Sequence, residues 1–125
     1  MTGVRIILPG IPPTANTYLG NSHHHKIYQT AKKEWENAVV WAVKTAGWRG
    51  EPLRKARVEL IYHFPDHRRR DPDNYSGKFI LDGLKKAGVL VDDSFSNVQL
   101  VLTAGNVDKW QPHVEILVSS LEEAV

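Results

Sequence analysis

Four aspartates in two short stretches are the residues of this 125-residue chain best suited to do chemistry. Asp71 and Asp73 flank a proline, and Asp92 and Asp93 follow a short apolar run. Side chains at positions i and i+2 of an extended segment point the same way, and proline biases the residue before it toward extended geometry. We therefore expect Asp71 and Asp73 to face one point at the mouth of a helix, with the second pair folded back beside them.

Carboxylates gathered in this way repel each other unless a cation lies between them. Mg²⁺ prefers hard oxygen ligands and typically uses one or two protein carboxylates together with water and substrate phosphate. The sequence therefore predicts a Mg²⁺ site with the ligands Asp71, Asp73, Asp92 and Asp93.

Basic residues lie directly beside these acids. Arg68, Arg69 and Arg70 precede Asp71, and Lys78 follows shortly after it. Guanidinium groups bind phosphate oxygens in a bidentate fashion, and a lysine can stabilise charge that develops on a reacting phosphate. Cations beside a metal site are what phosphodiester hydrolysis requires. The alternative is a solvated loop in which the arginines only neutralise their acidic neighbours.

Simpler interpretations of the acids stay open at this point. Turns favour aspartate, and Asp73 or Asn74 is a possible N-cap of the following helix. Residues 71–82 also have the twelve-residue length of an EF-hand loop. That match fails in detail, because Tyr75 takes the fifth position and Ser76 replaces the glycine of the sixth.

Hydrophobic periodicity predicts an α+β fold in the order β-α-β-α-β-β, with a small mixed sheet covered by two helices. A helix capped by Thr30 carries apolar residues at spacings of three and four and ends at Gly47 and Gly50, and a second ends at Gly88. A polar loop is expected over residues 14–26. The predicted strands cover residues 5–8, 57–64, 98–103 and 113–118.

Length and composition indicate a single domain, residues 1–125. Residues 1–70 hold twelve Lys/Arg and five Asp/Glu (+7), and residues 71–125 hold four and nine (−5), which sum to the net +2. A basic half suggests a polyanionic partner. There is no cysteine, no signal-peptide pattern and no apolar run near the roughly 20 residues that span a bilayer. We expect a cytoplasmic protein without a membrane segment.

Taken together, several motifs in order resemble the RusA family of Holliday junction resolvases, over nearly the whole chain. They are the proline-rich opening Pro9–Tyr18, then Arg69–Asn74, Lys78, Leu81–Leu84 and Asp92–Ser94.

The resemblance implies a homodimer that nicks four-way DNA junctions symmetrically, with Mg²⁺ or with Mn²⁺ in its place. It assigns catalysis to Asp71, Asp73, Asp93 and Lys78. It also places Asp92 beside the metal and makes Asn16, with Lys78 and the arginine run, a DNA contact. A flap or fork nuclease, a non-catalytic binder of branched DNA and a metal-binding module without DNA are the alternatives.

Two departures from the family pattern are visible. Asp73 and Lys78 lie five residues apart where the family usually has four, with Ser76 and Gly77 between them. Phe95, Ser96 and Asn97 occupy a region where the family commonly has Gln-Val. We therefore do not expect this chain to share the cleavage preference of the family.

Two further groups of residues have no chemistry assigned. His23, His24 and His25 are expected in a loop, either near DNA or simply solvated. Trp35, Trp41 and Trp48 are expected to pack in the core or at an interface.

Overall fold

A computed structural model describes residues 3–14 and 24–122, and side chains of the first helix from Lys26 on. It contains the predicted α+β fold, with one four-stranded mixed sheet and two helices in the predicted order. The strands are β1 (Gly3–Pro9), β2 (Ala56–His63), β3 (Val98–Ala104) and β4 (His113–Ser120). The helices are α1 (His24–Thr45) and α2 (Lys78–Lys86), and a 3₁₀ helix, η2, spans Pro72–Asn74.

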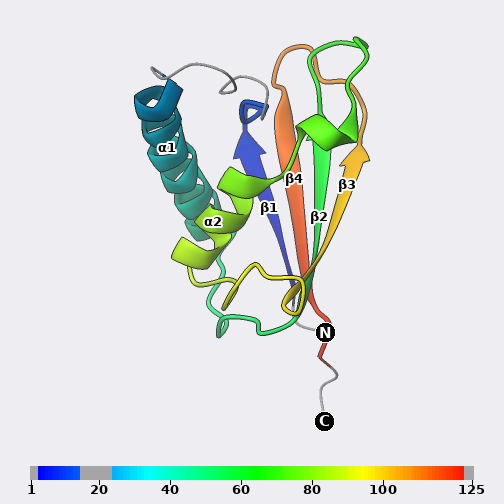
Figure 1. Ribbon diagram of the computed structural model, residues 1–125. Coiled ribbons are helices and arrows are strands. Elements are labelled where there is room, and N and C mark those ends of the chain that lie inside the picture. Colours follow the sequence, from blue (N-terminus) through cyan, green and yellow to red (C-terminus); the bar gives the residue numbers. More distant parts are fainter. Residues whose placement is uncertain (1–2, 15–23, 123–125) are drawn as a thin grey trace.

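The strands lie in the order β1-β4-β2-β3, in which β2 and β3 are parallel and the other neighbours are antiparallel. Both helices lie against the same side of this sheet (Figure 1). Alternate residues of β2, from Ala56 to Tyr62, are buried beneath the helices. The residues between them, from Arg57 to His63, point to the opposite side. We call that side the open face of the sheet.

Both helices end in the same way, as the glycines in the sequence predict. Gly47 and Gly88 take positive φ angles of 79° and 80°. After α1, the Trp48 N–H donates to the carbonyl of Val43, and after α2 the Val89 N–H donates to that of Leu84. These bonds form Schellman motifs, which satisfy the last carbonyl groups of each helix.

The start of α1 differs from the expectation. The helix begins at His24, so Thr30 is not its N-cap and the predicted loop does not extend to residue 26. No glycine or proline interrupts this segment, and the ring of Tyr28 packs 5.5 Å from that of Phe79 in α2. Packing against α2 therefore supports a helical turn that local sequence signals did not indicate. His24 belongs to the helix, and His23 lies outside the described residues.

The tryptophans divide between core and surface. Trp35 and Trp48 pack against the hydrophobic core, as expected. Trp41 is instead 68% exposed, so it lies outside the core, and its packing at an interface stays a prediction. In the described part of the chain, no helix is both long and apolar enough to cross a bilayer.

The two helices touch at a glycine. Gly83 of α2 is buried against Val39 of α1, and a Cβ atom at position 83 would lie 2.5 Å from the Val39 Cβ. The absence of a side chain at Gly83 thus sets how closely α1 and α2 approach.

Candidate active site

The arginine run forms a turn in which Arg70 is structural. Its guanidinium lies 4.4 Å from the ring of Phe64 and donates hydrogen bonds to the carbonyls of Asp66 and Arg68, both at 3.1 Å. Its second amino group pairs with the Asp66 carboxylate at 2.8 Å. The backbone N–H of Arg68, followed by the Arg70 and Arg68 side chains, lowers the pKa of Asp66 to about 2. Most donors of Arg70 are thus engaged within the protein.

Arg68 and Arg69 point into solvent, with side chains 83% and 90% exposed. Each makes an ion pair with a nearby aspartate, Arg68 with Asp66 at 3.1 Å and Arg69 with Asp71 at 3.2 Å. Exposed pairs of this kind contribute little to stability. Both guanidinium groups are therefore available to an anionic partner.

Asp71 and Asp73 do not share one extended segment. Asp71 is extended, with φ −101° and ψ 133°, as the following proline predicts. Asp73 instead lies within η2, where the Asn74 N–H donates to the carbonyl of Asp71. The i, i+2 geometry expected for the pair is therefore wrong, because the chain turns at Pro72.

The capping alternative is also wrong, because the residue before α2 is Gly77. Gly77 has a φ of 69°, and a Cβ there would lie 2.8 Å from the Leu60 side chain. Ser76 and Gly77 both lie before the helix begins. Lys78 is thus the first residue of α2.

The most concentrated charges lie along α2, in a set that we call the lysine–carboxylate cluster. Lys78 Nζ donates to Asp82 Oδ1 at 3.1 Å, and Lys85 Nζ lies 3.3 Å from Asp93 Oδ1 and 3.9 Å from Asp92 Oδ1. The Asp93 N–H donates to the Asp92 carboxylate at 2.9 Å. The members are Lys32, Lys78, Asp82, Lys85, Asp92 and Asp93.

Asp82 is the centre of this cluster. Its side chain is only 7% exposed, yet the Nζ atoms of Lys78, Lys32 and Lys85 lie 3.1, 3.7 and 4.0 Å away. Among the described residues, its Oδ2 atom has no hydrogen-bond partner and faces Lys32. A buried carboxylate requires such compensation by cations. Asp82 therefore also determines the positions of the three lysine amino groups.

The cluster shifts the protonation of its members. The hydrogen bond to Asp82, with the attraction of Asp82 and Asp93, outweighs desolvation and raises the pKa of Lys78. Partial burial opposes ionisation of Asp93, but the hydrogen bond from Lys85 and the charges of Lys85 and Lys78 prevail and lower its pKa. Lys78 is held as a cation and Asp93 as an anion.

The four predicted metal ligands, Asp71, Asp73, Asp92 and Asp93, all carry carboxylate groups. Among the described residues, no three of them have carboxylate oxygens within 4.8 Å of one another. Their chemistry nonetheless suits Mg²⁺, because all are hard oxygen donors and because Mg²⁺ needs only one or two protein carboxylates when water and phosphate complete its shell. The four carboxylates therefore suit Mg²⁺ chemically, but they do not form a complete coordination shell by themselves.

The sequence did not single out Asp82, Lys85 and Lys32, which the structure groups with Lys78 and Asp93. The spacings i, i+4 from Lys78 to Asp82 and i, i+3 from Asp82 to Lys85 place these residues on one helix face. No sequence spacing links Lys32 to Asp82, because Lys32 lies on α1 and Asp82 on α2. Asn16 lies outside the described residues.

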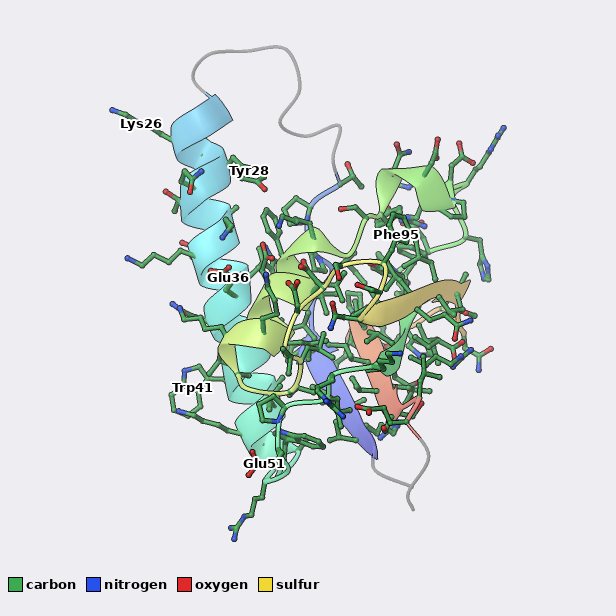
Figure 2. All side chains as sticks on the ribbon, turned by 60° about the horizontal axis from the view of Figure 1, so that its bottom comes forward. Lys26, Tyr28, Glu36, Trp41, Glu51 and Phe95 are labelled. Atoms are coloured by element: carbon green, nitrogen blue, oxygen red, sulfur yellow. The ribbon has the colours of Figure 1, made fainter. Side chains whose placement is uncertain are left out.

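An exposed aromatic ring lies next to the cluster. Phe95, on the loop between α2 and β3, is fully exposed and lies on the side of the molecule away from α1 (Figure 2). It lines a shallow groove together with Asp93, Leu81 and Leu100. An aromatic ring in this position offers a nucleobase a surface on which to stack.

The fold and the site together define a small α+β domain whose acids and cations suit phosphodiester chemistry. A family model described as endodeoxyribonuclease RusA matches residues 9–119. The chain therefore belongs to the RusA endodeoxyribonuclease family, which implies an endonuclease that resolves Holliday junctions. A search of curated proteins found no match.

Proposed function

We propose that this protein is a Mg²⁺-dependent endonuclease that resolves four-way DNA junctions by paired phosphodiester hydrolysis. The observation that carries the proposal is the lysine–carboxylate cluster, which lies inside the region that matches the family. Asp82 holds the amino groups of three lysines around itself. In the sequence, Asp71 and Asp73 precede it, and Asp92 and Asp93 follow it.

The basic residues act on the DNA backbone. Arg68 and Arg69, both exposed beside Asp71, bind phosphates that flank the cut. Lys78, kept protonated by Asp82, neutralises charge that builds up on the scissile phosphate. Arg70 contributes by holding the turn in shape, and Asn16 contacts DNA from the N-terminal segment.

The acidic residues hold the cofactor. Asp71, Asp73 and Asp93 are the ligands, with Asp92 beside them, and Mn²⁺ substitutes for Mg²⁺. A divalent ion held by these residues would supply a more acidic water molecule and positive charge beside the phosphate. Lys85 pairs with Asp93 and keeps that carboxylate ionised before the ion and DNA arrive.

Paired cuts require two active sites, so the working unit is a homodimer. A four-way junction has two-fold symmetry, and a symmetric dimer presents the same residues to two opposite strands. The groove beside Phe95 lies next to Asp93, and we place DNA against it.

The test is a cleavage assay on synthetic fixed and mobile junctions, with fork, flap and linear duplex for comparison. Each substrate is incubated with Mg²⁺, Mn²⁺, Ca²⁺ or EDTA. The variants are Asp73→Asn, Asp93→Asn and Lys78→Met, and Glu51→Gln is the matched carboxylate-to-amide control. Glu51 is exposed and lies at the far end of α1 from Lys26 (Figure 2).

We expect Mg²⁺ or Mn²⁺ to support symmetric nicks in junctions, EDTA to abolish them and only Glu51→Gln to retain full activity. Tight junction binding without nicks under any metal would instead identify a non-catalytic binder. Preference for flaps or forks would keep the chemistry and change the substrate. Unchanged cleavage by folded Asp73→Asn would remove that residue from the ligand set.

A further inference from the structure

Two histidines and a glutamate meet on the open face of the sheet, away from the lysine–carboxylate cluster. His63 ends β2 and His113 begins β4, and the two are directly paired across the strands. Glu115 lies two residues after His113 and therefore on the same face. Among the described residues, these three alone form a group of metal-ligating side chains whose ligand atoms all lie within 4.8 Å of one another.

The protons of both imidazole rings are fixed by the backbone. His63 Nδ1 lies 2.7 Å from the carbonyl oxygen of Asn106, and His113 Nδ1 lies 2.7 Å from that of Gln111. A carbonyl oxygen only accepts, so each Nδ1 carries the proton. In the neutral ring each Nε2 then presents a lone pair. Metal-binding histidines are characteristically oriented by this kind of bond to a backbone carbonyl.

The environment of His63 calls for a cation at its second nitrogen. His63 Nε2 lies 2.7 Å from Glu115 Oε1. An ionised carboxylate also only accepts, so the two atoms attract each other only through a proton or a metal ion. Arg5 donates to the other Glu115 oxygen at 2.9 Å. The Glu115 carboxylate thus faces His63 with one oxygen and Arg5 with the other.

The loop after β3 is shaped to hold the His63 ring. The Gly105 N–H donates to the carbonyl of Tyr62, which brings the loop across the end of β2. A Cβ at position 105 would lie 2.6 Å from His63 Cε1 and 2.9 Å from His63 Nδ1. Glycine is therefore needed for the Asn106 carbonyl to reach the ring. The three side chains are 13–22% exposed, sheltered yet open to a small ion.

We propose that His63, His113 and Glu115 form a binding site for a divalent transition metal of the zinc class. Imidazole nitrogen and carboxylate oxygen suit Zn²⁺ and its neighbours better than Mg²⁺. Tetrahedral ligands are about 3.4 Å apart for bonds of about 2.1 Å. In the structure the ligand atoms lie within 4.8 Å of one another and the two imidazole rings are stacked, with centroids 4.4 Å apart. Binding an ion therefore requires the side chains to turn from these positions until their lone pairs converge. Water or an external anion takes the fourth position.

The site joins β2, β4 and the loop that follows β3. Because its ligands face away from α2, the metal is separate from the proposed nuclease centre. Its expected effect is to stabilise the fold, since an ion that binds only the folded state adds to its stability. This inference does not depend on the proposed nuclease function.

The test measures Zn²⁺ binding to untagged protein by isothermal titration calorimetry at about neutral pH, with Mg²⁺ in excess. His23, His24 and His25 are a competing source of imidazole, so the parent protein carries all three as alanine. His63→Ala, His113→Gln and Glu115→Gln remove ligands, and His67→Ala is the control, because His67 is exposed and outside the group. Circular dichroism establishes that each variant is folded.

We expect equimolar Zn²⁺ binding that Mg²⁺ does not displace and a higher melting temperature with Zn²⁺. Each ligand variant should bind at least about tenfold more weakly, since losing even an outer partner of a ligand has that effect. His67→Ala should match the parent. Co²⁺ should give the intense visible absorption of a low-coordinate site. No Zn²⁺ binding by the parent, or unchanged binding by folded His113→Gln and Glu115→Gln, would overturn the proposal.

Discussion

Replacing Gly83 with alanine tests whether the contact between α1 and α2 is as close as the structure shows. The new Cβ would lie 2.5 Å from Val39 Cβ and 2.8 Å from Val39 Cγ1. Carbon atoms prefer roughly 3.5–4.0 Å, so the helices must separate by about 1 Å. Val39 is fully buried within the core.

Two opposing terms set the magnitude. Alanine gains about 1 kcal/mol over glycine inside a helix. Inserting a methyl group into a packed core costs about 1–3 kcal/mol, and both close neighbours here are on one rigid side chain, which places this case at the upper end. The net expectation for Gly83→Ala is a loss of about 1–2 kcal/mol in the free energy of unfolding.

Urea denaturation followed by circular dichroism measures this loss. A double-mutant cycle with Val39→Ala is the control, because that change removes Val39 Cγ1 and so relieves part of the overlap. We expect a favourable coupling of about 0.5–1 kcal/mol between the two positions. A more stable Gly83→Ala protein, or strict additivity, would show that the helices are farther apart than described.

Three further predictions concern the charges. Asp82→Asn should lower the pKa of Lys78, because the hydrogen bond to Asp82 raises it; NMR titration of the lysine signals measures this, and an unchanged pKa would refute the role of Asp82. Arg69→Ala should reduce the salt slope of junction binding by about one and leave stability unchanged, whereas Arg70→Ala should lower the urea midpoint; equal effects on stability would contradict the assignments. Folding lowers the pKa of Glu115, so the ionised carboxylate stabilises the fold above its unfolded pKa, and this stabilisation is lost as pH falls through its folded-state pKa. Glu115→Gln should therefore destabilise the protein at neutral pH and not in strong acid, as measured by urea denaturation at the two pH values.

Local patterns predicted most of the fold. The alternation along β2 identified a strand with one covered face, and the glycines at 47 and 88 marked both helix ends. The start of α1 was not predictable in this way. It depends on the contact of Tyr28 with Phe79, which lies in a different helix, and local patterns do not contain such contacts.

The charged residues of the candidate site can be read from the sequence, whereas their arrangement in space cannot. Motifs identified Asp93 and Lys78, and both belong to the lysine–carboxylate cluster. The importance of Asp82 follows from its burial beside a lysine of α1, which only the packing of the two helices reveals. The turn at Asp73 was missed because an i, i+2 rule assumes a straight chain, and Pro72 begins a 3₁₀ helix instead.

The position of β4 has a consequence for how the molecule is built. This strand comes after all the others in the sequence, yet it is central and contacts both β1 and β2. Until residues 113–120 are in place, β1 has no neighbour in the sheet and β2 has only β3. The surface that supports α1 and α2 is therefore incomplete until β4 has been synthesised. We expect the sheet, and with it the packing of both helices, to form in one step once residues 113–120 have been synthesised.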